Sequence, residues 1–182
     1  MPEVRGGCQQ RELMMPIRGK AILALAIFVA SQSVVAAPKE RATRIVVDKS
    51  DHLMHVYRKD KVIAVYRVGF GTSHVGHKQQ EGDRRTPEGH YMLDYKNAGS
   101  TFFKSIHISY PNAADRANAK RLGVKPGGDV MIHGEANDPV VRAAIDRHPY
   151  PDWTYGCISM KNDDMQRLWD VVSVPTPIHI VP

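Results

Sequence analysis

The sequence predicts a mainly β domain with short helices packed at its side. Short runs rich in β-branched residues dominate the chain from Thr43 onward, and charged or glycine-containing turns separate them. Three helix-forming stretches are brief and carry residues that suit helix caps. Strands and helices do not alternate regularly, which argues against a doubly wound parallel sheet. The sequence shows no internal repeat and no second folded domain.

The strands are expected from their composition. Thr43–Asp48 is the first, and Leu53–Tyr57 and Val62–Val68 form a hairpin across a charged turn. Gly69–Arg85 is polar and contains glycines, so we expect a long surface loop there. Thr86-Pro87-Glu88-Gly89 has the composition of a tight turn. Further strands are predicted at Tyr91–Tyr95, Ser105–Tyr110, Val130–His133 and Thr176–Val181.

Helix boundaries follow from the capping residues. Asn112–Leu122 begins with a residue that suits an N-cap, and Gly123 suits the C-terminal stop. A second helix is expected to begin at Asp138-Pro139, with a capping carboxylate and then a proline in the first turn, and to extend to about Arg147. A third is expected over Asn162–Val171, where early carboxylates complement the helix dipole.

The first 37 residues read as a secretory signal peptide. Ala21–Ala30 is an apolar run of ten residues, about half the length that a membrane-spanning helix needs. Basic residues precede this run and small residues follow it, and Val35-Ala36-Ala37 suits cleavage after Ala37. Translation from Met14 or Met15 would give a signal peptide of ordinary length. An uncleaved N-terminal anchor is the alternative interpretation.

Removal of this segment leaves residues 38–182 as one domain, which is large enough to bury a working core. It also implies an exported, periplasmic protein that contacts the inner membrane through the signal peptide before cleavage. The formal net charge of +6 fits an anionic wall polymer but is equally common without one. Basic runs interleaved with aromatic residues are absent, so nucleic-acid binding is not indicated.

Cys157 is the one cysteine left after the predicted cleavage, because Cys8 is removed with the signal peptide. An unpaired cysteine in an oxidising compartment is either a buried core residue or a retained reactive group. The neighbours of Cys157 favour reactivity. His133, at a predicted strand end before Gly134, can take the proton of a thiol. Gly156 permits a sharp turn that brings backbone N–H groups near a developing oxyanion.

Several motifs together resemble the YkuD-type L,D-transpeptidase catalytic domain. His133-Gly134 is followed by Thr154-Tyr155-Gly156-Cys157-Ile158, which is similar to the His-Gly, spacer, Ser/Thr-x-Gly-Cys signature of that family. Asp152-Trp153 precedes the second motif, as in a large exported subgroup. The similarity covers nearly all of the chain after the signal peptide. Its other parts are Thr86-Pro87-Glu88-Gly89, Ile106–Asn112 and Gly127–Gly134.

The resemblance implies a YkuD-type β-sandwich with the catalytic histidine and cysteine in one cleft. Cys157 would be the acylated nucleophile and His133 its general base. The carbonyl of Gly134 would orient the imidazole, and backbone N–H groups at Tyr155 and Gly156 would form the oxyanion hole. The substrate would be a peptidoglycan stem peptide, attacked between its diamino acid and D-alanine. A wall-attached lipoprotein is a further candidate acceptor or substrate, and no cofactor is implied.

Residues that bind the substrate are less sharply defined. Thr154 would support the catalytic loop, and Trp153 would anchor the packing of that loop. Tyr155 replaces the histidine that is frequent in the family, and Ser159 stands where many members carry arginine, which puts charge recognition at that position in doubt. The substrate carries carboxylates, so cationic side chains are candidates for binding them, although each could equally be an ordinary surface charge. These candidates are Lys78, Arg84, Arg85, Lys96 and Lys161.

Three alternatives remain open. If water resolves the thioester in place of an amine, the enzyme is an L,D-carboxypeptidase or an amidase. A non-catalytic wall-peptide receptor is the second, although such relatives usually lose the nucleophile or the base. The third is a metal site, because His52/His55 and His74/His77 have a spacing found in some zinc sites. Residues three apart on a strand point to opposite faces, however, and the second pair has no accompanying acidic or cysteine ligand, so we expect no metal.

Overall fold

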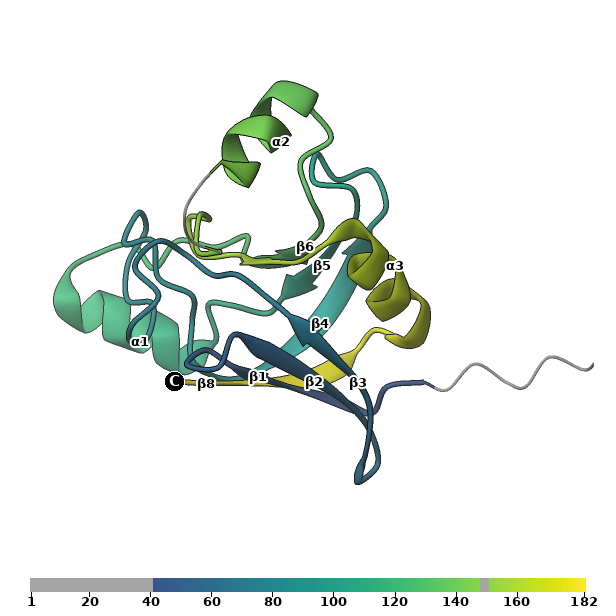
Figure 1. Ribbon diagram of the computed structural model, residues 1–182. Coiled ribbons are helices and arrows are strands. Elements are labelled where there is room, and N and C mark those ends of the chain that lie inside the picture. Colours follow the sequence, from purple (N-terminus) through teal and green to yellow (C-terminus); the bar gives the residue numbers. More distant parts are fainter. Residues whose placement is uncertain (1–40, 148–150) are drawn as a thin grey trace, which may run out of the picture. The chain divides into compact units, whose positions relative to one another are not determined.

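A single eight-stranded sheet dominates residues 41–147 and 151–182, which the computed structural model describes. The strands lie in the order β3-β2-β1-β8-β4-β5-β6-β7 (Figure 1). The predicted mainly β class with short helices is therefore confirmed. The predicted signal peptide and its cleavage site lie outside the described residues. The strands are β1 (Arg44–Asp48), β2 (Leu53–Arg58), β3 (Lys61–Arg67), β4 (Gly89–Asn97), β5 (Ser105–Ile108), β6 (Met131–His133), β7 (Ile158–Ser159) and β8 (Thr176–Val181).

The first three strands form an antiparallel meander, as their sequence pattern predicts. Ile45 and Val47 of β1 point into the core, and so do Met54 and Val56 of β2. The residues between them are half-buried on the other face of the sheet. This alternation fixes the register, because a shift by one residue would expose every apolar side chain.

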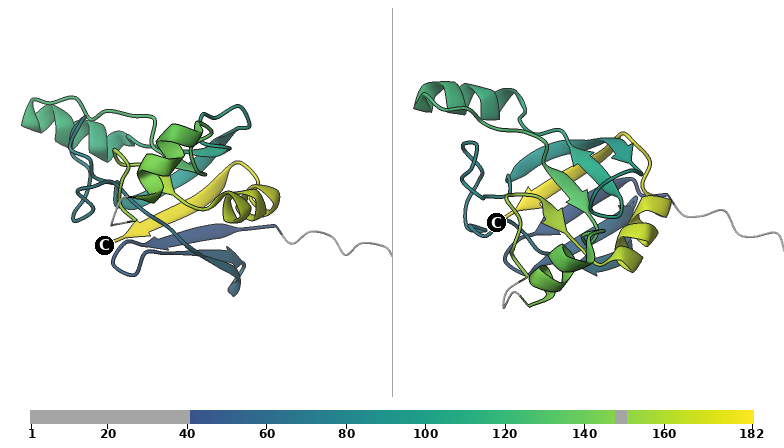
Figure 2. Two further views of the ribbon diagram at one scale, coloured as in Figure 1. Left: turned by 45° about the horizontal axis from the view of Figure 1, so that its top comes forward. Right: turned by 90° about the horizontal axis from the view of Figure 1, so that it is seen from above.

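Strand β8 joins the two halves of the sheet, since it pairs in parallel with β1 and antiparallel with β4. At the far end, β6 pairs in parallel with β7, a two-residue strand that the sequence did not predict. Isolated bridges join Gly69 to Ser159 and Gly71 to Thr154, so the segment that follows β3 lies along β7. The two edges of the sheet therefore meet, and the β5–β7 end lies over the β1–β3 end (Figures 1 and 2).

The three helices of the described residues are α1 (Ala113–Leu122), α2 (Pro139–Asp146) and α3 (Asn162–Val171). The Asn112 side chain caps α1 and the Asp138 side chain caps α2, as predicted. Gly123 ends α1 in a left-handed conformation with φ +66°. Helix α3 lacks a side-chain cap, and it packs its buried Met165 and Leu168 against the sheet. No helix in the described ranges has the length and hydropathy needed to cross a membrane.

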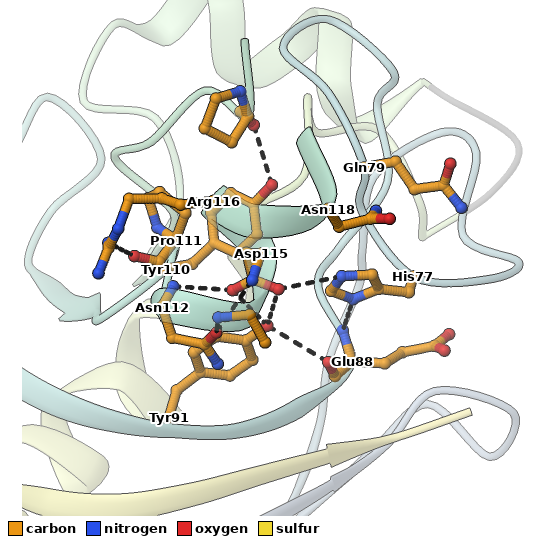
Figure 3. A network of polar contacts seen from close by, with 12 residues as sticks. His77, Gln79, Glu88, Tyr91, Tyr110, Pro111, Asn112, Asp115, Arg116 and Asn118 are labelled. Atoms are coloured by element: carbon orange, nitrogen blue, oxygen red, sulfur yellow. Dashed lines mark hydrogen bonds and ion pairs between the residues drawn. The ribbon is translucent and has the colours of Figure 1, made fainter. Parts of the chain in front are cut away.

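The segment Gly69–Arg85 forms the expected long loop, and much of it lies at the surface, but polar contacts fix it to the rest of the domain. Its His77 accepts the N–H of Glu88 at Nδ1 (3.0 Å) and pairs through Nε2 with Asp115 (3.1 Å) (Figure 3). Since Nδ1 accepts, Nε2 carries the proton and donates it. The buried Asp115 carboxylate also accepts from the Tyr91 hydroxyl and from the N-cap amide of α1. The network ties this segment to α1 and to β4.

Candidate active site

Strands β6 and β7 bring the candidate base and nucleophile to one face of the sheet. Ile132 pairs with Ile158, and both are completely buried in the core. Because side chains alternate along a strand, the next residue, His133, and the residue before Ile158, Cys157, both lie on the opposite face. The Sγ atom of Cys157 is 3.5 Å from the backbone nitrogen of Met131, on the strand that carries His133. The structure therefore places His133 and Cys157 on one face of the sheet, in neighbouring segments of the chain.

The imidazole of His133 is held in one tautomer. Its Nδ1 lies 2.7 Å from the carbonyl oxygen of Gly134. A carbonyl can only accept, so Nδ1 carries the proton and Nε2 is left as an acceptor. The ring packs against Phe102 and Trp153, with centroid separations of 4.7 Å and 5.6 Å. This burial lowers the pKa of His133, although the bond to Gly134 opposes the shift, and the neutral imidazole is favoured.

The Cys157 thiol, like the imidazole, is favoured in its uncharged form. Burial raises the pKa of Cys157 above its ordinary value of 9.0. The Met131 N–H and the Lys78 ammonium act in the opposite direction and favour the thiolate. The thiol is within 3.8 Å of the Asp129 carbonyl, an acceptor for its proton. Both shifts therefore favour the neutral forms, a protonated thiol and a neutral imidazole.

The loop before Cys157 is shaped by one hydroxyl. Oγ1 of Thr154 donates to the carbonyl of Cys157 (2.7 Å) and accepts the N–H of Gly156 (3.1 Å). Gly156 has φ +127°, and its Cα lies against the carbonyl of Arg85, where an added Cβ would be 2.6 Å from the oxygen. The Gly156 amide is thus engaged. The amides of Tyr155 and Cys157 have no hydrogen-bond partner among residues 41–147 and 151–182.

Asp152 anchors the start of this loop, a role that the sequence argument missed. Its buried carboxylate accepts the N–H of Phe70 (2.7 Å) and pairs with His52 (3.0 Å) and with His74 (3.1 Å). These partners are 82, 100 and 78 positions away in the chain, so no local motif indicates them. The Asp-Trp-Thr sequence was the one available signal. Asp152 therefore fixes the loop that carries Trp153 and Thr154 to the segment after β3.

The histidine spacings have a different explanation from metal binding. His74 pairs with Asp152 and His77 with Asp115, so each has the acidic partner that the sequence seemed to deny it. The expectation that His74 and His77 have no acidic residue beside them is therefore wrong. Within the described parts of the chain, no three side chains of the metal-ligating types gather into a group that could hold an ion.

Several of the candidate substrate-binding residues lie near the loop before Cys157 or at the start of α3. Tyr155 is 73% exposed beside Cys157, and the Arg84 guanidinium lies 4.9 Å from its ring centroid. Arg85 frames Gly156 through its main chain. Lys161, at the N-cap of α3, pairs with Glu135 (2.9 Å).

Two lysines have structural partners. Lys78 is buried, and its Nζ donates to Asp83 (2.8 Å) and to the Gln80 carbonyl (3.1 Å). A Cβ on Gly156 would be 3.8 Å from that Nζ, so the Lys78 ammonium lies close to the loop that precedes Cys157. Lys96 donates to the carbonyls of Trp169 and Val172 at the C-terminal end of α3 (both 2.6 Å). Lys96 therefore stabilises the end of this helix.

The sequence matches the YkuD family of L,D-transpeptidase catalytic domains over residues 42–180. It is also similar to the Escherichia coli K12 protein "Putative L,D-transpeptidase YafK", with 27% identity over 110 residues. That alignment covers 59% of this chain and 36% of YafK. The chain thus spans little more than a third of that relative.

Solved structures with the same fold include the helical cell shape determining protein Pgp2 of Campylobacter jejuni, with a TM-score of 0.58 and 24% identity over 78% of this chain and 48% of Pgp2. Bd1075 of Bdellovibrio bacteriovorus gives a TM-score of 0.53, again with 24% identity over 78% and 48% of the two chains. An L,D-transpeptidase of Mycobacterium smegmatis gives 0.50 and 17% identity, over 78% of this chain and 59% of that one. These similarities establish the fold, and the chain spans about half the length of the first two proteins.

Proposed function

Because the chain belongs to the YkuD-type L,D-transpeptidase catalytic domain family, we propose that it is an exported peptidoglycan L,D-transpeptidase that uses Cys157 as its nucleophile. The family acts on peptidoglycan stem peptides. The observation that carries the proposal is that an oriented imidazole and a half-buried thiol lie on the same face of the sheet, on β6 and directly before β7. A receptor without catalytic activity has no need of that arrangement.

In the first half-reaction, Nε2 of His133 accepts the thiol proton as Sγ of Cys157 attacks the carbonyl carbon of the diamino acid. The developing oxyanion is stabilised by the amides of Tyr155 and Cys157, which have no partner in the described residues. The C–N bond to D-alanine then breaks. His133 returns its proton to the departing amine, and a thioester remains on Cys157.

In the second half-reaction, an amine attacks the thioester carbonyl and His133 accepts a proton from that amine. The C–S bond breaks, the thiol is restored, and a new amide joins the two partners. A stem-peptide amine gives a cross-link between two diamino acids, and a lysine of a wall-attached lipoprotein gives an attached protein. Water in place of the amine gives an L,D-carboxypeptidase or amidase, which is the alternative function. We place the reaction in the periplasm.

Mass spectrometry of purified muropeptides incubated with the protein tests this proposal. Dimers joined through two diamino acids indicate transpeptidation, whereas tetrapeptides shortened to tripeptides indicate hydrolysis. In either case a carbapenem should add one adduct mass at Cys157, and Cys157→Ala should abolish both the adduct and the products. Unchanged muropeptides together with an unmodified wild-type protein would contradict the enzymatic proposal.

A further inference from the structure

A pocket of about 350 Å³ opens beside the candidate active site, between α2 and the segment that follows β3. Gly134 and Ser159 form part of its wall, and they lie next to His133 and two residues from Cys157. Trp153 also lines the pocket while its ring contacts His133. The pocket is therefore lined by residues that flank the candidate base and by the aromatic ring that packs against it.

The lining of this pocket combines an apolar wall with charges of both signs. Val68, Ile145 and Met160 provide aliphatic surface, and Trp153 adds an aromatic face. Such a wall favours a short hydrocarbon chain. The charged residues of the lining are Arg67, Arg142, Lys161, Glu135 and Asp146.

The cationic side chains of the pocket differ in how many protein groups they already bind. The Lys161 ammonium pairs with Glu135 at 2.9 Å and reaches Asp146 at 3.9 Å. Arg142 uses Nε to donate to the Ala136 carbonyl and interacts electrostatically with Glu135, and its two terminal nitrogens make no hydrogen bond to the described residues. Arg67, exposed at the end of β3, has no ion-pair partner in residues 41–147 and 151–182. Two guanidinium groups are thus available for a carboxylate, the anion that their planar geometry suits.

Ser159, whose side chain is small, lines the pocket. Many family members carry arginine at this position, and here a small hydroxyl side chain stands there instead. Arg67 and Arg142 bring positive charge to the same pocket from β3 and from α2.

We propose that this pocket binds the side chain of the stem peptide's diamino acid through its terminal carboxylate and ammonium. The methylene groups of that side chain lie along Val68 and Ile145, and the carboxylate is bound by Arg67 and Arg142. The ammonium faces Asp146, which is half-exposed and has one long contact, to Lys161. This assignment rests on the proposed function, because it names the part of the same substrate that sets specificity.

Three synthetic tetrapeptides test the assignment, with D-alanine release as the readout. Their diamino acids end in ammonium plus carboxylate, in ammonium plus carboxamide, or in ammonium alone. We expect the KM of the carboxylate peptide to be about tenfold lower than those of the other two. Arg67→Gln and Arg142→Gln should each remove this preference by raising that KM, with kcat little changed. Arg142→Lys should restore part of it, and Arg167→Gln, on the exposed face of α3, should have no effect.

The outcomes separate this assignment from the proposed function. If the wild-type protein releases D-alanine from all three peptides with equal KM, the pocket assignment is wrong and the function stands. If it releases none, the proposed function fails, and calorimetric titration of Cys157→Ser with the same peptides decides about the pocket. Selective binding of the carboxylate peptide that Arg67→Gln weakens would support the assignment, and equal or absent binding would overturn it. Thermal unfolding of each variant confirms that it is folded.

Discussion

Replacing Gly156 with alanine tests how strictly the backbone of the catalytic loop is constrained. Gly156 has φ +127°, a conformation that residues with a Cβ rarely adopt. An added Cβ would also lie 2.6 Å from the carbonyl oxygen of Arg85, a main-chain atom. The loop would have to open by about 0.8 Å before this contact reached the ordinary separation of 3.4 Å.

We expect Gly156→Ala to lower the free energy of unfolding by about 2–5 kcal/mol, from backbone strain and from the overpacked contact together. A displacement of this size at a reacting group costs on the order of 100-fold in rate, so acylation should fall at least that far. Gly82→Ala is the matched control, since Gly82 has φ +79° and an added Cβ meets nothing within 4 Å. That variant should lose about 1–2 kcal/mol and acylate at the wild-type rate.

Urea unfolding measured by tryptophan fluorescence gives the stability difference, and intact-mass measurement of the carbapenem adduct gives the acylation rate. Both variants place alanine at positive φ, so the difference between them measures the contact with Arg85 together with the greater backbone strain at φ +127°. If Gly156→Ala loses no more stability than Gly82→Ala and acylates at the same rate, the loop is not constrained as inferred. The proposed geometry of the oxyanion hole would then lose its basis.

Three further predictions concern buried polar groups. Asp115→Asn should lower the free energy of unfolding by about 1–3 kcal/mol, because an amide N–H would face the groups that now donate to the carboxylate. Urea unfolding measures this difference, and no loss of stability would contradict the prediction. Lys96→Met should cost a similar amount in the same measurement while leaving acylation unchanged, since its ammonium serves the end of α3, and slowed acylation would oppose that role. Peptide acylation should keep its rate as the pH falls to 6.5 and decline below that, because burial lowers the pKa of His133 and the neutral ring is the base; a decline that begins above 6.5 would refute this.

A matching pH dependence is expected of the thiol. Burial raises the pKa of Cys157, so alkylation by iodoacetamide should be slow near neutral pH and should accelerate as the pH passes above 9.0. The thiolate is the reacting form, and its fraction rises with pH through the raised pKa. Fast alkylation that does not vary between mildly acidic and neutral pH would instead indicate a preformed thiolate–imidazolium pair.

The helices and the meander could be predicted because their signals are local. Asn112 and Gly123 bound α1 through bonds within a few residues, and the alternation in β1 and β2 repeats over several positions. Strand β7 could not be predicted, since two residues are too few for any periodicity to appear. Its existence depends on β6 on one side and on Gly69 on the other.

Some residues of the candidate site could be predicted from the sequence and others could not. Cys157 and His133 were accessible because their residue types carry chemistry and their flanking glycines carry conformation. The roles of Asp152 and of His77 were not, because their partners lie far away in the chain. The loop Gly69–Arg85 was predictable from its composition, whereas the burial of Phe70 and Lys78 within it depends on contacts with distant residues.

The central position of β8 has a consequence for the order in which the domain can form. Although β8 is last in chain order, it is the strand through which β1 and β4 are joined. A chain that has emerged only as far as Val174 lacks the ladders that join β1 to β4, and its two half-sheets are then connected through the bridges of Gly69 and Gly71 to the segment around β7. Cys157 is already present in such a chain, while β8 is still missing from the sheet. The segment that carries Cys157 therefore belongs to an incomplete sheet until β8 has joined β1 to β4.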